Sequence, residues 1–158
     1  MSADASLFDR LAREAEHPSV SANRDLVLSA LGYAEDPVLL RRALELSLTL
    51  ELTPRQVSKL LWQAARRRNN RAILYAWITS EWTRIRTKWK DDVLWPVLGV
   101  AELACSDHDR KKLEGVFVDV SINQWNWLKD RLREAIDCSD LRDYASASTI
   151  AYLRFSNP

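Results

Sequence analysis

Two carboxylate pairs are the residues in this chain whose types and spacing most resemble acid–base machinery. Asp91 and Asp92 are adjacent, and Glu134 and Asp137 are three residues apart. Such a pair divides the roles of general acid and general base when its surroundings push the two pKa values apart. Acids near a helix start also offset the helix dipole, and acids three residues apart share a solvated helix face. No Ser/His/Asp or Cys/His set accompanies them in the sequence, so we expect no catalytic residue here.

Histidine and cysteine are common zinc ligands, and the chain has two of each. His17 precedes Pro18, and His108 lies in the charged run SDHDRKK. Neither belongs to an H-E-x-x-H motif, which places two zinc ligands on one helix face. Cys105 and Cys138 are too far apart for a C-x-x-C redox motif, and we expect them to be buried free thiols. The sequence therefore predicts no metal or cofactor site in this chain.

Arginine is concentrated between two expected helices, at Arg66, Arg67, Arg68 and Arg71. Cations at the C-terminal end of a helix offset its dipole and bond its last carbonyl groups. A guanidinium group also binds a carboxylate through two parallel hydrogen bonds. The alternative to this helix-end role is a functional one. In it, the candidate peptide-contacting residues are Arg66, Arg67 and Arg71, which bind an acidic side chain or the C-terminal carboxylate of a peptide.

The seven tryptophans are candidates for a binding platform, because aromatic rings stack on bases and on peptide side chains. Four of them fall on apolar helical stripes and are expected in the core: Trp77, Trp82, Trp89 and Trp125. Helical periodicity does not explain the other three: Trp62, Trp95 and Trp127. An exposed pair among these three is a candidate docking surface.

Overall charge and hydropathy exclude several classes of partner. The net charge of +1 gives no general attraction to nucleic acid or an anionic membrane. A nucleic-acid-binding module built on residues 66–71 and 84–90 is therefore the disfavoured alternative. The N-terminal stretch MSADASLFDRLAREAEH lacks the apolar run of a signal peptide, and no run approaches the roughly 20 residues of a membrane span. We expect a cytoplasmic protein, unless a signal was removed upstream of this segment.

The elements that position these residues are predicted to be helices. Only three glycines and five prolines are present, whereas strand-and-turn folds need more turn residues. Three polar residues are expected to cap helix starts: Asp36, Thr53 and Ser121. Thr53 and Ser121 are each followed three residues later by Gln, which is the capping-box spacing.

Apolar residues follow at helical spacing in three successive stripes. These are Leu40, Leu44 and Leu48, then Val57, Leu60, Leu61, Ala64 and Ala65, then Leu74, Ile78, Trp82, Ile85 and Trp89. Further helices are expected near residues 7–15, 24–31, 93–105, 107–118, 122–136 and 141–155, roughly nine in all. Helices joined by short connections lie as antiparallel hairpins, and stacked hairpins form a solenoid. We predict one all-α domain over residues 1–158, an α-solenoid of HEAT or armadillo type.

Residues 31–89 resemble the C-terminal helical domain of the zinc aminopeptidases, a family that includes aminopeptidase N and the puromycin-sensitive and endoplasmic-reticulum enzymes. The family pattern runs Asp-Pro-x-Leu-x-x-Arg-x-Leu-x-Leu-Ser-Leu, then Gln, then Gly-Arg-x-x-x-Trp and Asn-Trp. The matching residues here are Asp36, Pro37, Leu39, Arg42, Leu44, Leu46, Ser47, Leu48, Gln56, Arg71, Trp77 and Trp82. Residues 7–32 are similar to the preceding hairpin of the family. Asn70 stands where the family pattern has Gly, a residue that lets backbones approach closely. A tight junction between the two helices at this position therefore does not follow from the resemblance.

This resemblance implies a non-catalytic C-terminal domain of a larger zinc aminopeptidase. In that architecture the helical domain covers the catalytic cleft and gates or encloses peptide substrates. The zinc, held by H-E-x-x-H, and the removal of N-terminal residues belong to the parent enzyme. The implied partners are the upstream catalytic domains of the same polypeptide and the peptide substrate. The alternative is a free-standing helical-repeat scaffold that binds a protein or peptide in its concave face, which requires polar outer faces on both terminal hairpins.

Overall fold

The computed structural model describes residues 3–18, 21–90, 97, 99–100, 107–116 and 130, and all secondary structure in them is helical. The helices are α1 (Ala3–Glu16), α2 (Ser21–Gly32), α3 (Pro37–Thr49), α4 (Pro54–Arg66), α5 (Arg68–Trp89) and α7 (Asp107–Val116). Residues 97, 99 and 100 are also helical, within the predicted segment 93–105. The prediction of an all-α fold is therefore confirmed for this part of the chain.

Several sequence predictions fall on residues outside the described ones. They concern the helix expected at 141–155, the helix expected at 122–136 apart from residue 130, which is helical, the cap at Ser121, both cysteines, both carboxylate pairs, and Trp95, Trp125 and Trp127. The predicted number of helices is likewise not settled by the six described here.

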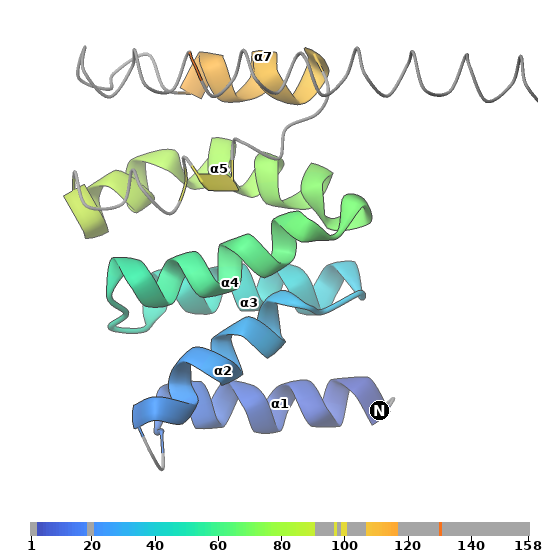
Figure 1. Cartoon of the computed structure of the whole chain (residues 1–158), viewed down its shortest axis with the longest axis vertical. Helices are drawn as coiled ribbons and strands as arrows, with labels where there is room; N and C mark the ends of the chain where they lie inside the picture. Colours follow the sequence, from blue (N-terminus) through green and yellow to red (C-terminus); the bar gives the residue numbers. More distant parts are fainter. Residues whose placement is uncertain are drawn as a thin grey trace, which may run out of the picture.

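The helices are stacked in layers along the long axis of the molecule (Figure 1). Each one packs mainly against helices one or two places away in the chain. Helix α1 contacts α2 and α3, α2 contacts α4, α3 and α4 contact α5, and α5 contacts α7. Short connections between successive helices impose this order, because neighbours in sequence are forced to lie side by side.

Side-chain caps set the starts of α3 and α4, as predicted. Asp36 Oδ1 accepts hydrogen bonds from the backbone N–H groups of Val38 at 2.7 Å and Leu39 at 3.2 Å. The Thr53 hydroxyl accepts from the Gln56 N–H at 3.3 Å, and Gln56 Oε1 accepts from the Thr53 N–H at 3.0 Å. This reciprocal pair is a capping box, and it satisfies two N–H groups that the helix itself leaves unpaired.

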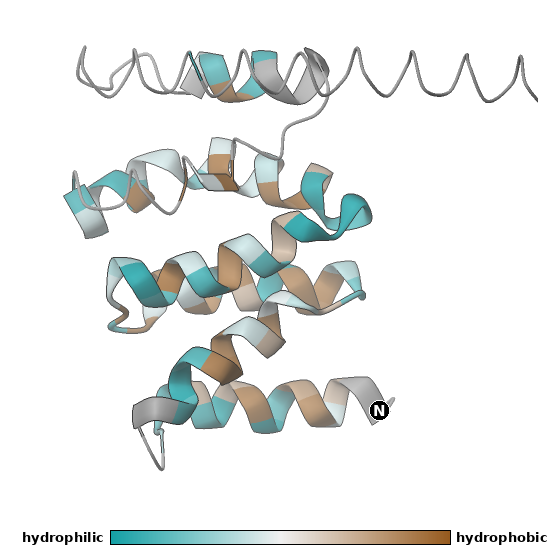
Figure 2. Ribbon diagram, viewed as in Figure 1, coloured by the Kyte–Doolittle hydropathy of each residue, from teal (hydrophilic) through white to brown (hydrophobic). Residues whose placement is uncertain are grey.

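The predicted apolar stripes belong to the hydrophobic core. Brown and teal positions are interspersed along helices α1 to α4 (Figure 2). Every residue of the three stripes is buried, including Trp82 and Trp89, and Trp77 beside them is buried as well. Burying this apolar surface is the main stabilising contribution in a helical stack.

Helices α2 and α4 are in close contact at Gly32. A β-carbon on residue 32 would be 2.4 Å from the carbonyl oxygen of Leu60 and 3.0 Å from Gln63 Cβ. The first of these neighbours is backbone within a helix and has little freedom to move. Only glycine therefore allows α2 to end at this depth against α4.

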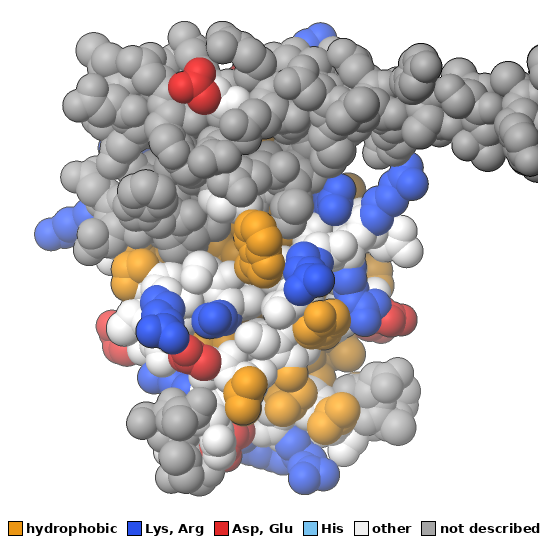
Figure 3. All heavy atoms as spheres, viewed as in Figure 1, with side chains coloured by type: hydrophobic (Ala, Val, Ile, Leu, Met, Phe, Trp, Pro, Cys, Tyr) orange, Lys and Arg blue, Asp and Glu red, His pale blue; other side chains and the backbone are white. Residues whose placement is uncertain are grey.

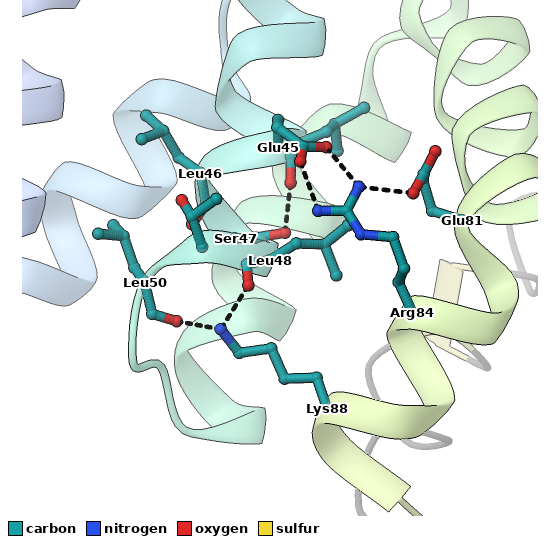
Figure 4. A network of polar contacts seen from close by, with 10 residues as sticks. Glu45, Leu46, Ser47, Leu48, Leu50, Glu81, Arg84 and Lys88 are labelled. Carbon is teal, nitrogen blue, oxygen red and sulfur yellow. Dashed lines mark hydrogen bonds and ion pairs between the residues drawn. The ribbon is translucent and has the colours of Figure 1, made fainter.

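Polar contacts join α3 to α5 at the edge of the core (Figure 4). Lys88 Nζ donates to the carbonyl oxygens of Leu48 and Leu50, both at 2.6 Å, and so satisfies the C-terminal end of α3. Arg84 donates to Glu45 Oε1 and to Glu81 Oε2, each at 2.7 Å. Both hydrogen bonds raise the pKa of Arg84, and the one to Glu45 is the larger cause.

None of the helices that the structure describes is both long and apolar enough to span a membrane.

Candidate functional site

The junction between α4 and α5 consists of one extended residue, Arg67, with φ −85° and ψ 115°. Its guanidinium pairs with the Glu35 carboxylate and lies 5.2 Å from the centroid of the Tyr33 ring. Tyr33 and Glu35 belong to the loop between α2 and α3, which is distant in sequence. Arg67 therefore holds that loop against the end of α4.

Arg71 lies one turn into α5, and its Nε donates to the carbonyl oxygen of Ala65 at 2.7 Å. Ala65 is in the last turn of α4, where carbonyl groups lack a partner within the helix. Arg71 therefore does what the helix-end interpretation of the arginine cluster predicts.

Asn70 closes the same junction from inside. Its side chain is only 2% exposed, and its Nδ2 donates to the carbonyl oxygen of Ala34 at 2.9 Å. The family pattern has glycine here, which allows close backbone contact, whereas this chain uses a side-chain amide to link α5 to the α2–α3 loop. The departure at Asn70 is thus accompanied by a hydrogen bond from this buried residue to the α2–α3 loop.

Arg66 points elsewhere, into a cavity of about 380 Å³ on the face that carries α2 and α4. We name this cavity the Trp62 pocket after its central side chain, which is 39% exposed. The residues that line it are Ser29, Ser58, Lys59, Trp62, Gln63, Arg66 and Gly99. Figure 3 shows basic and hydrophobic side chains lying side by side on this face. Of the three candidate arginines, only Arg66 is among the described residues that line this cavity, whereas Arg67 and Arg71 bond within the α4–α5 junction.

A second cavity, of about 390 Å³, lies between α1, the end of α2 and the start of α3. Its floor is apolar and includes Phe8, Leu11 and Leu39, and its acidic residues are Glu35 and Asp36. Both acids are already engaged, since Glu35 pairs with Arg67 and Asp36 caps α3. This cavity therefore offers apolar surface but no free carboxylate.

A metal centre does not fit the described part of the chain. No group of three or more His, Cys, Asp or Glu side chains lies close enough together there to hold an ion. His17 is exposed, directly after α1. We therefore assign no zinc to these residues.

Sequence reasoning missed Lys59 and Gln63 as members of a site with Arg66. Lys59, Trp62 and Arg66 are spaced by three and four residues, which places them on one face of α4. This spacing was available in the sequence. The contribution of Ser29 and Gly99 was not, because it depends on how α2 and the 97–100 helical segment pack beside α4.

Comparison with known proteins identifies the family of this chain. No curated protein matches the chain. The chain does match the family of the ERAP1-like C-terminal domain over residues 1–140, a range that includes all six described helices. The chain therefore belongs to the ERAP1-like C-terminal domain family, the C-terminal domains of ERAP1-like aminopeptidases.

Proposed function

We propose that this chain is the non-catalytic C-terminal domain of a zinc-dependent aminopeptidase, in which it covers the catalytic cleft and gates or encloses peptide substrates. The observation that carries this proposal is the family match over residues 1–140. The sequence supports it, since neither histidine lies in an H-E-x-x-H motif and the chemistry is then supplied by another part of the polypeptide. The parent enzyme removes N-terminal amino acids from peptides in the cytoplasm.

The stacked helices support a role as a wall around a substrate. Each described helix contacts mainly its near neighbours in the chain, and this order is typical of an α-solenoid of HEAT or armadillo type, the architecture we propose for the chain. A curved stack of roughly nine helices presents one concave face. Placed over a catalytic cleft, such a face excludes bulk water and limits which peptides enter.

The exposed apolar side chains of the first hairpin also support contact with other domains. Leu7 is 54% exposed and Leu26 is 70% exposed. A free-standing solenoid needs polar outer faces on its terminal hairpins to remain soluble. These two leucines therefore fit better with a hairpin that packs against the upstream domains than with an independent scaffold.

Within this domain, Arg66, Arg67 and Arg71 remain the candidate peptide-contacting residues. Arg67 and Arg71 each have a partner that holds the α4–α5 junction. Arg66 is exposed, lines the Trp62 pocket and has no ion-pair partner among the described residues, so it is the strongest candidate. For Arg67 or Arg71 to contact a peptide, it would have to give up its present bond, to Glu35 or to the Ala65 carbonyl oxygen.

The native size of the polypeptide tests the proposal. Peptides from this region should be detected in the cytosolic fraction, in a denatured species several times larger than 18.2 kDa. After native separation, that species should co-migrate with aminopeptidase activity that chelators remove. A native product of 18.2 kDa without such activity would contradict the proposal and favour the independent scaffold.

The gating role needs a second measurement on the parent enzyme. Deleting this domain should largely preserve cleavage of a single-residue chromogenic amide and alter the dependence of rate on peptide length. An unchanged length dependence would contradict gating while leaving the aminopeptidase assignment intact.

A further inference from the structure

The Trp62 pocket holds two positive charges that nothing described nearby compensates. Neither Lys59 nor Arg66 has an ion-pair or hydrogen-bond partner within the described residues, and none of the described residues that line the pocket is acidic. Other cations of α4 and its end are paired, Arg55 with Asp25 and Arg67 with Glu35. Among the described residues, the pocket therefore carries an excess of positive charge, which attracts negative charge, although the chain as a whole is nearly neutral.

The two cations flank an aromatic ring. Lys59 and Arg66 are seven residues apart on α4, which is about 10 Å along the helix axis. Trp62 lies between them on the same face, three residues after Lys59 and four before Arg66. Its ring is partly exposed and packs near Gly99, where an added β-carbon would be 3.8 Å from Trp62 Cζ3. The pattern is an apolar centre between two positive ends.

Three neutral oxygens of the pocket can accept hydrogen bonds. Gln63 Oε1 is buried and has no partner among the described residues. The Ser29 hydroxyl donates to the carbonyl oxygen of Asp25 at 2.9 Å, and the Ser58 hydroxyl donates to that of Arg55 at 2.7 Å. Both hydroxyl protons are thus in use, so these oxygens can only accept further bonds. A ligand that brings an N–H donor can therefore pair with Gln63 Oε1.

We propose that the Trp62 pocket binds an acidic peptide segment in which two carboxylates flank an apolar side chain. The carboxylates pair with Lys59 and Arg66, the apolar side chain packs on Trp62, and a backbone N–H donates to Gln63 Oε1. Peptide is favoured over nucleic acid because the net charge of the chain is only +1, and these two cations alone offer little attraction for a run of phosphates. In an extended peptide of the form Glu-Ser-Leu-Ser-Glu, all three key side chains lie on one face and the acids are about 13 Å apart.

This inference deepens the proposed function and rests on it for its biological meaning, since it names acidic peptides as the class that the domain retains. The binding itself is a property of this chain and does not require the catalytic domains. It is therefore measurable separately from the identity of the parent enzyme.

The test is fluorescence anisotropy of a labelled Glu-Ser-Leu-Ser-Glu peptide titrated with the purified 158-residue chain. Both peptide ends are blocked, so that only side-chain carboxylates are available. We expect saturable binding that weakens with added salt, and about tenfold weaker binding when both Glu residues of the peptide are replaced by Gln. Equal affinity for the two peptides, or no binding of the acidic one, would overturn the proposal.

Substitutions locate the binding on the protein. Lys59→Gln and Arg66→Gln should each weaken binding several-fold, and Trp62→Ala should weaken binding of the Leu peptide more than that of one with Ser in its place. The matched control is Arg41→Gln, an exposed cation on α3 outside the pocket. All four positions are exposed, so the variants should remain helical, and circular dichroism checks this. An equal loss in Arg41→Gln would mean non-specific charge attraction and would overturn the assignment to this pocket.

Two further outcomes separate the alternatives. A single-stranded oligonucleotide that displaces the peptide at a lower concentration than the unlabelled peptide itself would replace this inference with a nucleic-acid surface. Acidic-peptide binding by a chain whose native form is 18.2 kDa would support the inference while the proposed function fails. An aminopeptidase parent whose isolated domain ignores the peptide would give the reverse result.

Discussion

Gly32 and Leu60 lie so close that a β-carbon on residue 32 would be 2.4 Å from the Leu60 carbonyl oxygen. This contact sets the depth at which the end of α2 rests on the middle of α4. It also brings α2 close enough for Ser29 to line the Trp62 pocket. A single missing side chain thus connects the packing of the first two layers to the shape of the candidate site.

Gly32→Ala should destabilise the chain by about 1–3 kcal/mol, because the added methyl group forces two helix backbones apart. Urea unfolding followed by circular dichroism measures the change in the free energy of unfolding. The control is Gly115→Ala in α7, where nothing lies within 4 Å of the added β-carbon. This control should be neutral or stabilising by up to about 1 kcal/mol, and a loss as large as that at Gly32 would contradict the steric explanation.

Lys88→Met should lower the free energy of unfolding by about 1.5–3 kcal/mol. The substitution keeps an apolar stem but removes the ammonium group that donates to the Leu48 and Leu50 carbonyl oxygens. These carbonyl groups at the end of α3 would then lose a charged partner. Thermal unfolding at constant pH measures the effect, with Lys112→Met on the exposed face of α7 as the control. Indistinguishable midpoints for the two variants would count against this role.

Asn70→Ala should cost about 1–3 kcal/mol, since it leaves the Ala34 carbonyl oxygen without the amide that now bonds to it. The neighbouring Asn69 is exposed and provides a matched control. Asn69→Ala should be neutral or slightly stabilising, because alanine is the better helix former. The comparison requires only denaturant titrations of the two variants. A similar result for both would show that the buried hydrogen bond adds little.

Arg84→Met should destabilise the chain less than Lys88→Met, and the loss should shrink as salt is added, because Arg84 is exposed to solvent. Hydrogen bonds to Glu45 and Glu81 raise the pKa of Arg84 in the folded chain. The stabilisation from its charge is therefore fully present below the unfolded pKa and is lost only as pH rises through the folded one. The difference in unfolding free energy between wild type and Arg84→Met should stay constant from about pH 6 to 9. A marked change within that range would assign the effect to another group.

Local signals in the sequence predicted most of the described fold. The caps at Asp36 and Thr53 depend on residues within three positions, and the structure confirms both. The stripes depend on helical spacing alone, which is why their burial could be predicted without knowing the partner helices. Trp62 lay outside any stripe, and its partial exposure agrees with that.

Contacts between residues far apart in sequence could not be predicted. The bond from Asn70 to Ala34 spans 36 positions, and the pair of Arg67 with Glu35 spans 32. Both depend on how the α2–α3 loop meets the α4–α5 junction. The same break explains why Arg66 and Arg67, adjacent in sequence, have different surroundings. A cluster of like residues in a sequence is therefore weak evidence for a common site when a helix end divides it.

Helix α5 links two parts of the described stack, the helices α1 to α4 on one side and α7 on the other, since it contacts α3 and α4 as well as α7. Its 22 residues form a rod about 33 Å long. The angle between the first hairpins and α7 therefore depends on the straightness of this rod. A slight bend in α5 would tilt the two halves relative to each other while the packing within each half stayed intact.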